Sequence, residues 1–415
     1  MSAPVRLAYL VTHPIQYQAP LLRLIANQPD IDLHVMFGSD FSARQFTDPG
    51  FGRTIAWDVP LLDGYSHEVL PALGRPLADT ELPGFWRPLS HGIARRLTAG
   101  RFDALWVHGY NRACHWAAML AAKRRGLAVL LRDEATQVSA QRSILKRAAK
   151  HAFFRLLDRA VDGYLTIGSL NREYYLGHGV ASAKLFAMPY AVDNGFFQAA
   201  LAGTAPERAL LRARLGLASD RPVILFAAKL IARKRPLDLL EAYARIWREP
   251  EARRPYLLFA GDGTQRGALE SAIARGGLGL GPDGGAQLLG FQSQAQLAAL
   301  YDLADVLVLP SERESWGLVV NEAMNAGCAI VVNDRIGAGA DLVHGGDNGF
   351  VYPCGDVAAL AVSLRSVLRD PARCRAMGER SRAIIARWSF AEDLAGLRAA
   401  LATCVRARAA AEALA

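Results

Sequence analysis

Short apolar runs alternate with amphipathic stretches along the first half of the chain. The apolar runs carry no internal polar alternation, which is typical of parallel strands buried on both faces. We therefore expect a parallel sheet with helices on both sides. The predicted strands are 6–12, 32–38, 104–109, 127–133 and 163–169, and the predicted helices between them are 21–28, 116–126 and 171–179.

The same rhythm begins again in the second half. After the strand-like segment 184–190, the strand pattern lapses at 195–220, and we place a linker there. The sequence thus predicts an α/β protein with two doubly wound domains facing each other across a cleft, 1–194 and 221–387. A helical tail, 388–415, is expected to pack back toward the first domain. The second-half strands are 222–229, 256–263, 286–291, 305–311 and 328–334, and the helices are 236–247, 267–277, 296–304 and 319–327.

Composition excludes several classes of protein. Of 415 residues, 52% are hydrophobic and 21% charged, so the chain is not disordered. Five scattered cysteines, with no Cys-x-x-Cys pair, argue against a disulfide framework or a zinc site. No apolar run reaches the roughly 18 residues of a membrane span, and no cleavage pattern follows the first strand. We expect a cytoplasmic protein without a metal site.

The net charge is positive, because 48 Lys and Arg residues outnumber 39 Asp and Glu residues by 9. Such an excess favours a polyanionic partner: a phosphorylated substrate, an anionic membrane or nucleic acid. Segment 141–159 has six basic residues, one acidic residue and apolar positions at helical spacing. It predicts either a helix docked on the sheet or a peripheral attachment to an anionic membrane. No motif supports nucleic-acid binding, which we do not expect.

The stretch 305–334 carries the most chemistry. A buried strand, a polar loop and a helix opening near Gly317 follow one another. Free amides at a helix start form an anion site. Glu314 and Glu322 flank that site, where carboxylates suit sugar hydroxyls better than phosphate. Alternatively, Glu314 caps the helix and Glu322 faces solvent.

The pattern Pro-Ser-x-x-Glu-Ser-Trp-Gly-Leu-x-x-x-Glu at 310–322 strongly resembles glycosyltransferase family 4, retaining nucleotide-sugar enzymes with the GT-B fold of two Rossmann-like domains. The resemblance is close over about 160–360. It implies a nucleoside-diphosphate sugar as co-substrate, with no other cofactor. Four further segments match in order, namely 184–197, 226–240, 257–263 and 288–311.

The resemblance implies that Lys229 and Lys234 bind the donor diphosphate, and that the amides at Gly317 and Leu318 meet its distal phosphate. Breaking the anomeric bond places negative charge on the leaving diphosphate. Preorganised cations and amides stabilise that charge more in the transition state than in the ground state. Since no Asp-x-Asp stands in a plausible donor loop, we expect a metal-independent reaction.

By the same resemblance Glu322 holds the ribose and Glu314 the transferred sugar, which makes Glu314, Lys229 and Lys234 the expected catalytic residues. UDP-sugars are favoured over GDP-sugars by family frequency alone. Other donor-side residues implied by the motifs are Ser315, Trp316, Gly261, Gly263, Phe291 and Gln292.

The first half departs from the family pattern. His-Pro-Ile-Gln-Tyr at 13–17 replaces the usual Gly-rich loop and looks like a bacterial subgroup of the family. Arg132 stands where many members have a His that contacts the sugar, and it has the charge to reach an oxyanion. Because polar residues after parallel strands meet at one edge of the sheet, we expect acceptor contacts there. The candidates are His13, Gln16, His108, Tyr110, Asn111, Arg132 and Asp133.

The resulting prediction is a retaining glycosyltransferase that acts on a glycan or a polyprenyl-linked glycan in bacterial envelope or exopolysaccharide synthesis. Two other GT-B activities remain open. A nucleotide-sugar epimerase would need acid/base groups such as His13, Asp133 and Glu134, and a phosphorylase would need a phosphate site of its own.

Overall fold

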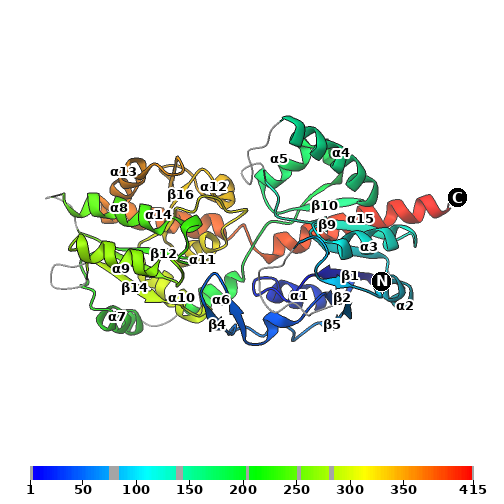
Figure 1. Ribbon diagram of the computed structural model, residues 1–415, viewed down its shortest axis with the longest axis horizontal. Helices are drawn as coiled ribbons and strands as arrows, with labels where there is room; N and C mark the ends of the chain where they lie inside the picture. The colour runs from blue at the N-terminus through cyan, green and yellow to red at the C-terminus, as the bar shows by residue number, and fades with distance from the viewer. Residues whose placement is uncertain are drawn as a thin grey trace. The chain divides into compact units, whose positions relative to one another are not determined.

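The chain divides into two compact units, each built around one parallel sheet (Figure 1). The first unit contains residues 1–49, 54–190 and 390–415, and the second contains 50–53 and 191–389. The computed structural model describes residues 3–73, 84–136, 144–201, 205–249, 254–279 and 285–413.

Within the described ranges, the first unit holds a seven-stranded sheet in which neighbouring strands run parallel. β1 lies in the interior, between β8 and β2, and Leu7 of β1 stands opposite both Leu33 and Ala104. In spatial order the strands are β11 (Leu185–Ala187), β10 (Gly163–Thr166), β9 (Ala128–Arg132), β8 (Ala104–His108), β1 (Val5–Val11), β2 (Ile31–Phe37) and β5 (Ser66–Val69).

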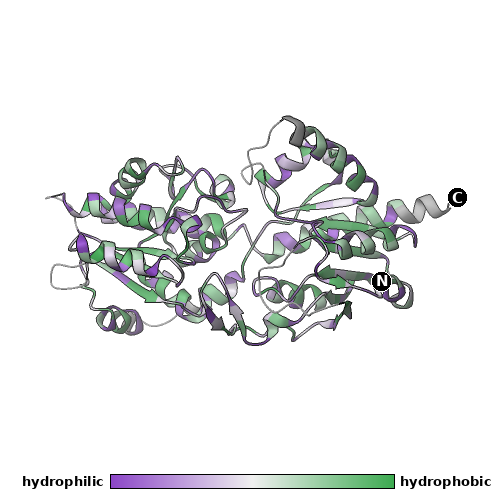
Figure 2. Cartoon of the chain, in the orientation of Figure 1, coloured by the Kyte–Doolittle hydropathy of each residue, from purple (hydrophilic) through white to green (hydrophobic). Residues whose placement is uncertain are grey.

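Helices cover both faces of this sheet, which explains why the strands are apolar throughout (Figure 2). The first-unit helices are α1 (Ala19–Ala26), α2 (Ile93–Gly100), α3 (Ala113–Lys123), α4 (Ile144–Ala160), α5 (Ser169–Gly177) and α15 (Phe390–Ala413). Successive strand residues enter opposite cores: Leu131 joins the core under α2, α3, α4 and α5, whereas Leu130 joins the core under α1 and α15.

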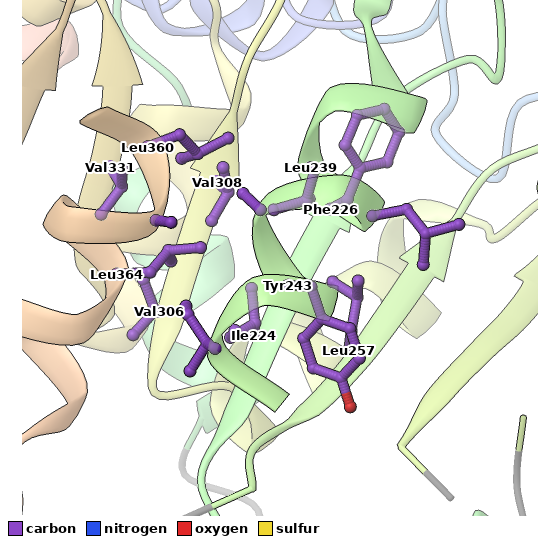
Figure 3. Close-up of a cluster of buried hydrophobic side chains, with 14 of the residues drawn as sticks. Ile224, Phe226, Leu239, Tyr243, Leu257, Val306, Val308, Val331, Leu360 and Leu364 are labelled. Atoms are coloured by element: carbon purple, nitrogen blue, oxygen red, sulfur yellow. The ribbon is translucent and has the colours of Figure 1, made fainter. Parts of the chain in front are cut away.

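The second unit holds a six-stranded parallel sheet in its described part. Figure 3 shows one of its cores, where Phe226 and Val308 of the central strands meet Leu239, Tyr243 and Leu360 of the covering helices. In spatial order the strands are β14 (Ala286–Gly290), β13 (Tyr256–Ala260), β12 (Val223–Ala227), β15 (Val306–Leu309), β16 (Ala329–Asn333) and β17 (Gly349–Tyr352).

The segment predicted as a linker, 195–220, contains most of one helix and the whole of another, so it is not simply extended chain. Helix α15, at the end of the chain, belongs to the first unit. The second-unit helices are α6 (Asn194–Leu201), α7 (Ala205–Arg214), α8 (Pro236–Trp247), α9 (Arg266–Arg275), α10 (Gln294–Leu303), α11 (Val319–Ala326), α12 (Gly337–Leu342), α13 (Val357–Leu368) and α14 (Pro371–Ile385).

The predicted α/β class is confirmed, and each predicted strand overlaps an observed one. The pattern did not predict β5 and β17, which are four residues long. β5 is an edge strand of the first-unit sheet, and β17 is an edge strand of the second-unit sheet. The pattern also missed two short antiparallel pairs. These are β3 (Phe46–Asp48) with β4 (Arg53–Ile55), and β6 (Ala72–Leu73) with β7 (Leu89–Ser90).

Candidate active site

A tight turn joins β15 to α11 in the second unit. Gly317 has φ = +103°, and a Cβ there would lie 2.9 Å from Cδ2 of Leu309, so no other residue fits without a shift. In the described chain, the amides of Gly317 and Leu318 donate to no protein acceptor. Helix α11 begins two residues later at Val319. The turn therefore offers free N–H groups and a helix N-terminus to an anion.

Glu314 forms an ion pair with Lys234 across this loop. Nζ of Lys234 donates to Oε1 of Glu314, and the two side chains are 15% and 14% exposed, respectively. Nη1 of Arg233 lies 3.8 Å from the other carboxylate oxygen. Glu314 does not cap α11, since Leu318 occupies the N-cap without a side-chain hydrogen bond. The capping alternative is therefore wrong, and the carboxylate lies among cations.

Backbone contacts fix both partners of this pair. The amide of Glu314 donates to the carbonyl of Arg335 (3.0 Å), and its own carbonyl accepts from Gly337 (3.1 Å). Lys234 ends a short 3-10 turn after β12. Burial lowers the pKa of Lys234, while Glu314 acts in the opposite direction. The carboxylate of Glu314 thus helps to keep this largely buried lysine charged.

Two glycines position the loop that carries Lys229. A Cβ on Gly261 would lie 2.0 Å from the carbonyl oxygen of Ala228, and one on Gly263 would lie 2.6 Å from that of Leu230. The amide of Leu230 also donates to the carbonyl of Asp262 (2.8 Å). These glycines therefore let two strand ends approach closely, which is a packing role that supports the lysine.

Glu322 lies on the first turn of α11 and does not point freely into solvent. Its Oε2 accepts a 2.6 Å hydrogen bond from the hydroxyl of Tyr301, on α10. Burial raises the pKa of Glu322 to about 7, and the Tyr301 bond opposes that rise. The solvent-facing alternative is therefore wrong. Tyr301 was not among the predicted site residues, although a tyrosine on the apolar side of a helix could have indicated it.

The remaining donor-side candidates divide into half-buried and buried side chains. Ser315 and Gln292 are half-buried, and Gln292 donates to the carbonyl of Leu289 (2.9 Å). Phe291 meets Phe51, of the segment 50–53 that belongs to this unit, with ring centroids 5.0 Å apart. Trp316 corrects our expectation, because its side chain is only 4% exposed.

The Trp316 ring stacks on Trp388 at 5.3 Å, and its Nε1 donates to Oδ1 of Asn321 (2.8 Å). This side chain anchors α11 from inside the unit. Only the Trp316 backbone, beside Gly317, remains able to border a ligand.

In the first unit, His13 and His108 lie near the ends of β1 and β8. The hydroxyl of Tyr9 donates to Gln18 (2.7 Å), whose amide nitrogen lies 3.2 Å from Nδ1 of His108. Nδ1 of His13 lies 2.9 Å from the hydroxyl of Thr12. Burial lowers the pKa of His13 to about 4 and of His108 to about 3, so both rings are neutral at pH 7.

Arg132 and Asp133 contradict the role we expected for them. Arg132 is 1% exposed, and its Nη2 donates to Asp393 (3.0 Å) and to two backbone carbonyls. Asp133 is buried and accepts hydrogen bonds from Tyr175 and Asn171. Both side chains hold the unit together, so neither is free to bind an acceptor.

Tyr110 packs against α4. Its hydroxyl accepts from Nζ of Lys150 (3.1 Å), and its ring lies 5.5 Å from Phe153. Asn111 is exposed and Gln16 is half-buried. Because His13, His108 and Tyr110 are half-buried as well, Arg132 and Asp133 are the expected acceptor residues whose side chains are buried.

Within the described residues, no group of three or more His, Cys, Asp or Glu is placed to hold a metal ion. None of the helices in those ranges combines the length and apolar character of a bilayer span.

The second unit is similar to known glycosyl transferases. Residues 207–384 match the family model of glycosyl transferases, group 1. The chain is 32% identical over 227 residues to a D-inositol 3-phosphate glycosyltransferase of Kineococcus radiotolerans, covering 51% of this chain and 49% of that protein. It is 30% identical over 240 residues to an alpha-D-kanosaminyltransferase of Streptomyces kanamyceticus, covering 58% and 56%. The chain thus spans about half the length of these relatives.

Solved structures resemble the chain over nearly its whole length. Anabaena HepE in complex with UDP has a TM-score of 0.72 at 16% identity, covering 96% of this chain and 100% of that one. A sucrose-phosphate synthase of Thermosynechococcus elongatus has a TM-score of 0.65 at 21% identity, covering 94% and 96%. The chain therefore has the GT-B fold, and its residues 207–384 resemble the glycosyl transferases of group 1.

Proposed function

We propose that this protein is a retaining, metal-independent glycosyltransferase that moves a sugar from a nucleoside-diphosphate sugar to a glycan or polyprenyl-linked glycan. One observation carries the proposal. Lys234 pairs with Glu314 of the loop whose Gly317 and Leu318 amides are free, and both residues lie inside the segment that resembles group 1 glycosyl transferases. Cation, carboxylate and amides are the groups that a diphosphate-linked sugar requires.

The diphosphate is the leaving group, and its charge grows as the anomeric bond breaks. That charge is stabilised by the ammonium groups of Lys234 and Lys229 and by the backbone N–H of Gly317. Because these groups are held by the turn and by backbone contacts, they need little reorganisation during the reaction. Glu314 accepts a hydrogen bond from the transferred sugar. The acceptor attacks from the face that the diphosphate leaves, so no enzymic nucleophile is assigned.

Glu322 holds the nucleoside end of the donor. Its carboxylate lies one helical turn from the free amides, and Tyr301 fixes one oxygen. The ribose hydroxyls donate to the remaining acceptor sites. The solved HepE structures contain UDP and UDP-glucose, which supports UDP over GDP as the nucleotide for this chain.

Binding of UDP-glucose tests this function directly. UDP-glucose should raise the melting temperature of the purified protein equally with and without EDTA, since a ligand that binds only the folded state stabilises it. Lys234→Ala should abolish most of that shift. Arg373→Gln, an exposed cation on α14, is the matched control and should keep it. A shift that requires added magnesium or manganese would overturn the metal-free mechanism.

We propose further that α4 attaches the protein to an anionic membrane surface, where a polyprenyl-linked acceptor would lie. Phe154 and Leu157 are buried against the sheet, whereas Arg155, Arg159 and the 56% exposed Leu156 form the outer side. Residues 141–143 and the side chains of 144–147, within the basic segment of the sequence, lie outside the described part. The docked face and the basic face thus coexist on one helix.

A further inference from the structure

A pocket within the second unit lies outside the candidate active site. Its volume is about 390 Å³, which falls within the roughly 300–1,000 Å³ of small-molecule sites. Charged side chains of both signs line it, among them Arg208 of α7, Asp302 of α10, and Arg375 and Glu379 of α14. The pocket therefore has the size and the polar groups that a small, charged ligand requires.

The pocket lies at the amino ends of the parallel strands. Pro222, Asp305 and Gly327 line it, and they come just before β12, β15 and β16, respectively. The turn at Gly317, by contrast, follows the carboxyl end of β15. Because the strands run parallel, the pocket and the candidate active site lie at opposite edges of one sheet. A ligand in the pocket thus binds apart from the nucleotide sugar.

The cations of the pocket are accessible. Arg208 and Arg375 are exposed, and among the described residues neither side chain forms an ion pair or a hydrogen bond. Arg382 adds a third exposed guanidinium, of which Nη2 donates to the carbonyl of Ala326 (2.6 Å). Guanidinium groups that no carboxylate neutralises are well suited to phosphate, which accepts several charge-assisted hydrogen bonds.

Two carboxylates of the pocket are accessible as well. Asp302 is half-buried and Glu379 is exposed, and in the described chain neither side chain accepts a hydrogen bond or pairs with a cation. A carboxylate accepts hydrogen bonds from hydroxyl groups but repels phosphate. A ligand that suits both the carboxylates and the arginines therefore has a phosphate at one end and hydroxyl groups elsewhere.

Other charged residues hold the wall of the pocket in place. Nη2 of Arg212 donates to the carbonyls of Ala218 and Arg221, both at 2.7 Å. Oδ2 of Asp305 accepts from the amide of Val223 (2.8 Å), at the start of β12. These bonds tie the end of α7, the following loop and two strands together. The pocket is thus formed by the fold itself, before any ligand binds.

We propose that this pocket binds a sugar phosphate, separately from the nucleotide sugar. The phosphate binds to the arginines, and hydroxyl groups of the sugar donate to Asp302 and Glu379. In the described ranges, none of the lining residues is aromatic, so no ring is available to stack on a nucleobase. This favours a sugar phosphate over a nucleotide. The inference concerns a site other than the donor site and does not depend on the proposed function.

Phosphorus NMR titrations of the full chain test the pocket. The probes are glucose 6-phosphate and inorganic phosphate. Glucose 6-phosphate should bind more tightly, because only it has hydroxyl groups for the carboxylates. Arg375→Gln should weaken its binding roughly tenfold, since the amide lacks the positive charge. Arg373→Gln is the matched control, because Arg373 is exposed on the same helix but does not line the pocket, and it should bind as the wild type does.

Two further variants give independent readouts. Arg208→Gln, on a different helix from Arg375, should weaken the binding of both probes. Asp302→Ala removes an acceptor for hydroxyl groups and leaves the arginines unchanged. It should therefore lower the ratio of the glucose 6-phosphate affinity to the phosphate affinity, which compares two probes on one variant. Thermal melts of each variant verify the fold.

Lys234→Ala shows whether the probe binds at the donor site instead. It should leave the binding of glucose 6-phosphate unchanged while it abolishes stabilisation by UDP. If Lys234→Ala removes that binding and Arg375→Gln does not, the inference is wrong and the donor function stands. Equal affinities for the two probes would show an adventitious anion site only and would also overturn it, as would no binding of glucose 6-phosphate. Normal binding of glucose 6-phosphate without any stabilisation by UDP would contradict the proposed function and not the pocket.

Discussion

Replacing Glu314 with Gln separates the two halves of the proposed donor chemistry. The amide has the size of the carboxylate but lacks its charge, so it cannot pair with Lys234 in the same way. The free nucleoside diphosphate does not contain the transferred sugar that Glu314 is proposed to bind. We therefore expect sugar transfer to fall on the order of a hundredfold, comparable to losing one preorganised transition-state contact. UDP affinity should not fall with it.

The pair itself sets the size of the second effect. Two unit charges about 4 Å apart interact by roughly 4 kcal/mol at an effective dielectric constant of about 20, before desolvation is subtracted. Both side chains keep some exposure, which weakens the ion pair. We therefore expect that removing the charge of Glu314 makes about 1 kcal/mol of the interaction free energy of Lys234 available for binding UDP. UDP affinity at pH 7 should then rise by up to about fivefold. No change in affinity is also compatible with the proposal; a large loss is not.

The lysine supplies a pH signature. Burial lowers the pKa of Lys234 and Glu314 opposes that lowering, so Glu314→Gln should lower the pKa further. A lysine with a lower pKa loses its charge earlier as pH rises. UDP affinity of the variant should therefore begin to decline at a lower pH than that of the wild type as the pH is raised above 7.

Calorimetric titration with UDP, initial transfer rates and thermal melts on the same samples measure all three effects. Glu312→Gln is the matched control, because Glu312 is an exposed glutamate two residues away in the same loop. It should behave as the wild type in each assay. Normal turnover by Glu314→Gln would refute the assignment. Equal losses of UDP affinity and rate would show that Glu314 serves the fold and not the sugar.

Three further predictions follow from the structure. Burial raises the pKa of Glu322 to about 7, so UDP-glucose, which has no group titrating near 7, should bind more tightly as pH rises through 7, and Glu322→Gln should remove that dependence. Asp393→Ala should lower the free energy of unfolding by about 3–5 kcal/mol in denaturant titrations, because it leaves Arg132 buried without its partner. The double variant Asp393→Leu with Arg132→Met should recover much of that loss, because it leaves no buried charge. Anionic vesicles should bind the protein in cosedimentation more than neutral ones, and Arg155→Gln with Arg159→Gln should weaken that binding by roughly 1 kcal/mol per residue; equal binding to both vesicle types would contradict this.

The fold could be predicted because both sheets are parallel and covered on both faces. Leu130 and Leu131 point into different cores, so the strand must be apolar at every position, and such runs are visible in a sequence. The edge strands β5 and β17 escaped notice because an edge strand is short and partly exposed. The Val69 side chain, for example, is 42% exposed. Their hydrophobic signal is therefore no stronger than that of a loop.

The site was only partly predictable, because sequence spacing cannot show which charges pair. Glu314 and Lys234 are eighty positions apart, and only the fold brings them together. Arg132 shows the opposite failure. A cation after a strand suggested an exposed ligand contact, but its partner lies 261 positions away on the last helix, where no local pattern could indicate it. Buried ion pairs between distant elements are thus the features that motif reasoning mistakes for binding residues.

Chemistry explains why the second unit carries a readable motif and the first does not. A leaving diphosphate requires fixed positive charge at one place. Few structural features supply it: a lysine held by backbone contacts, a glycine turn and a helix N-terminus. Each of these features restricts the sequence; at Gly317 and Gly261, for example, a Cβ would clash with neighbouring atoms. Acceptor hydroxyls need only well-placed oxygen atoms, which Glu, Asp, Tyr, Ser and backbone carbonyls can all provide. Contacts of this kind leave no recognisable spacing in a sequence, so acceptor specificity has to be sought in the structure and not in motifs.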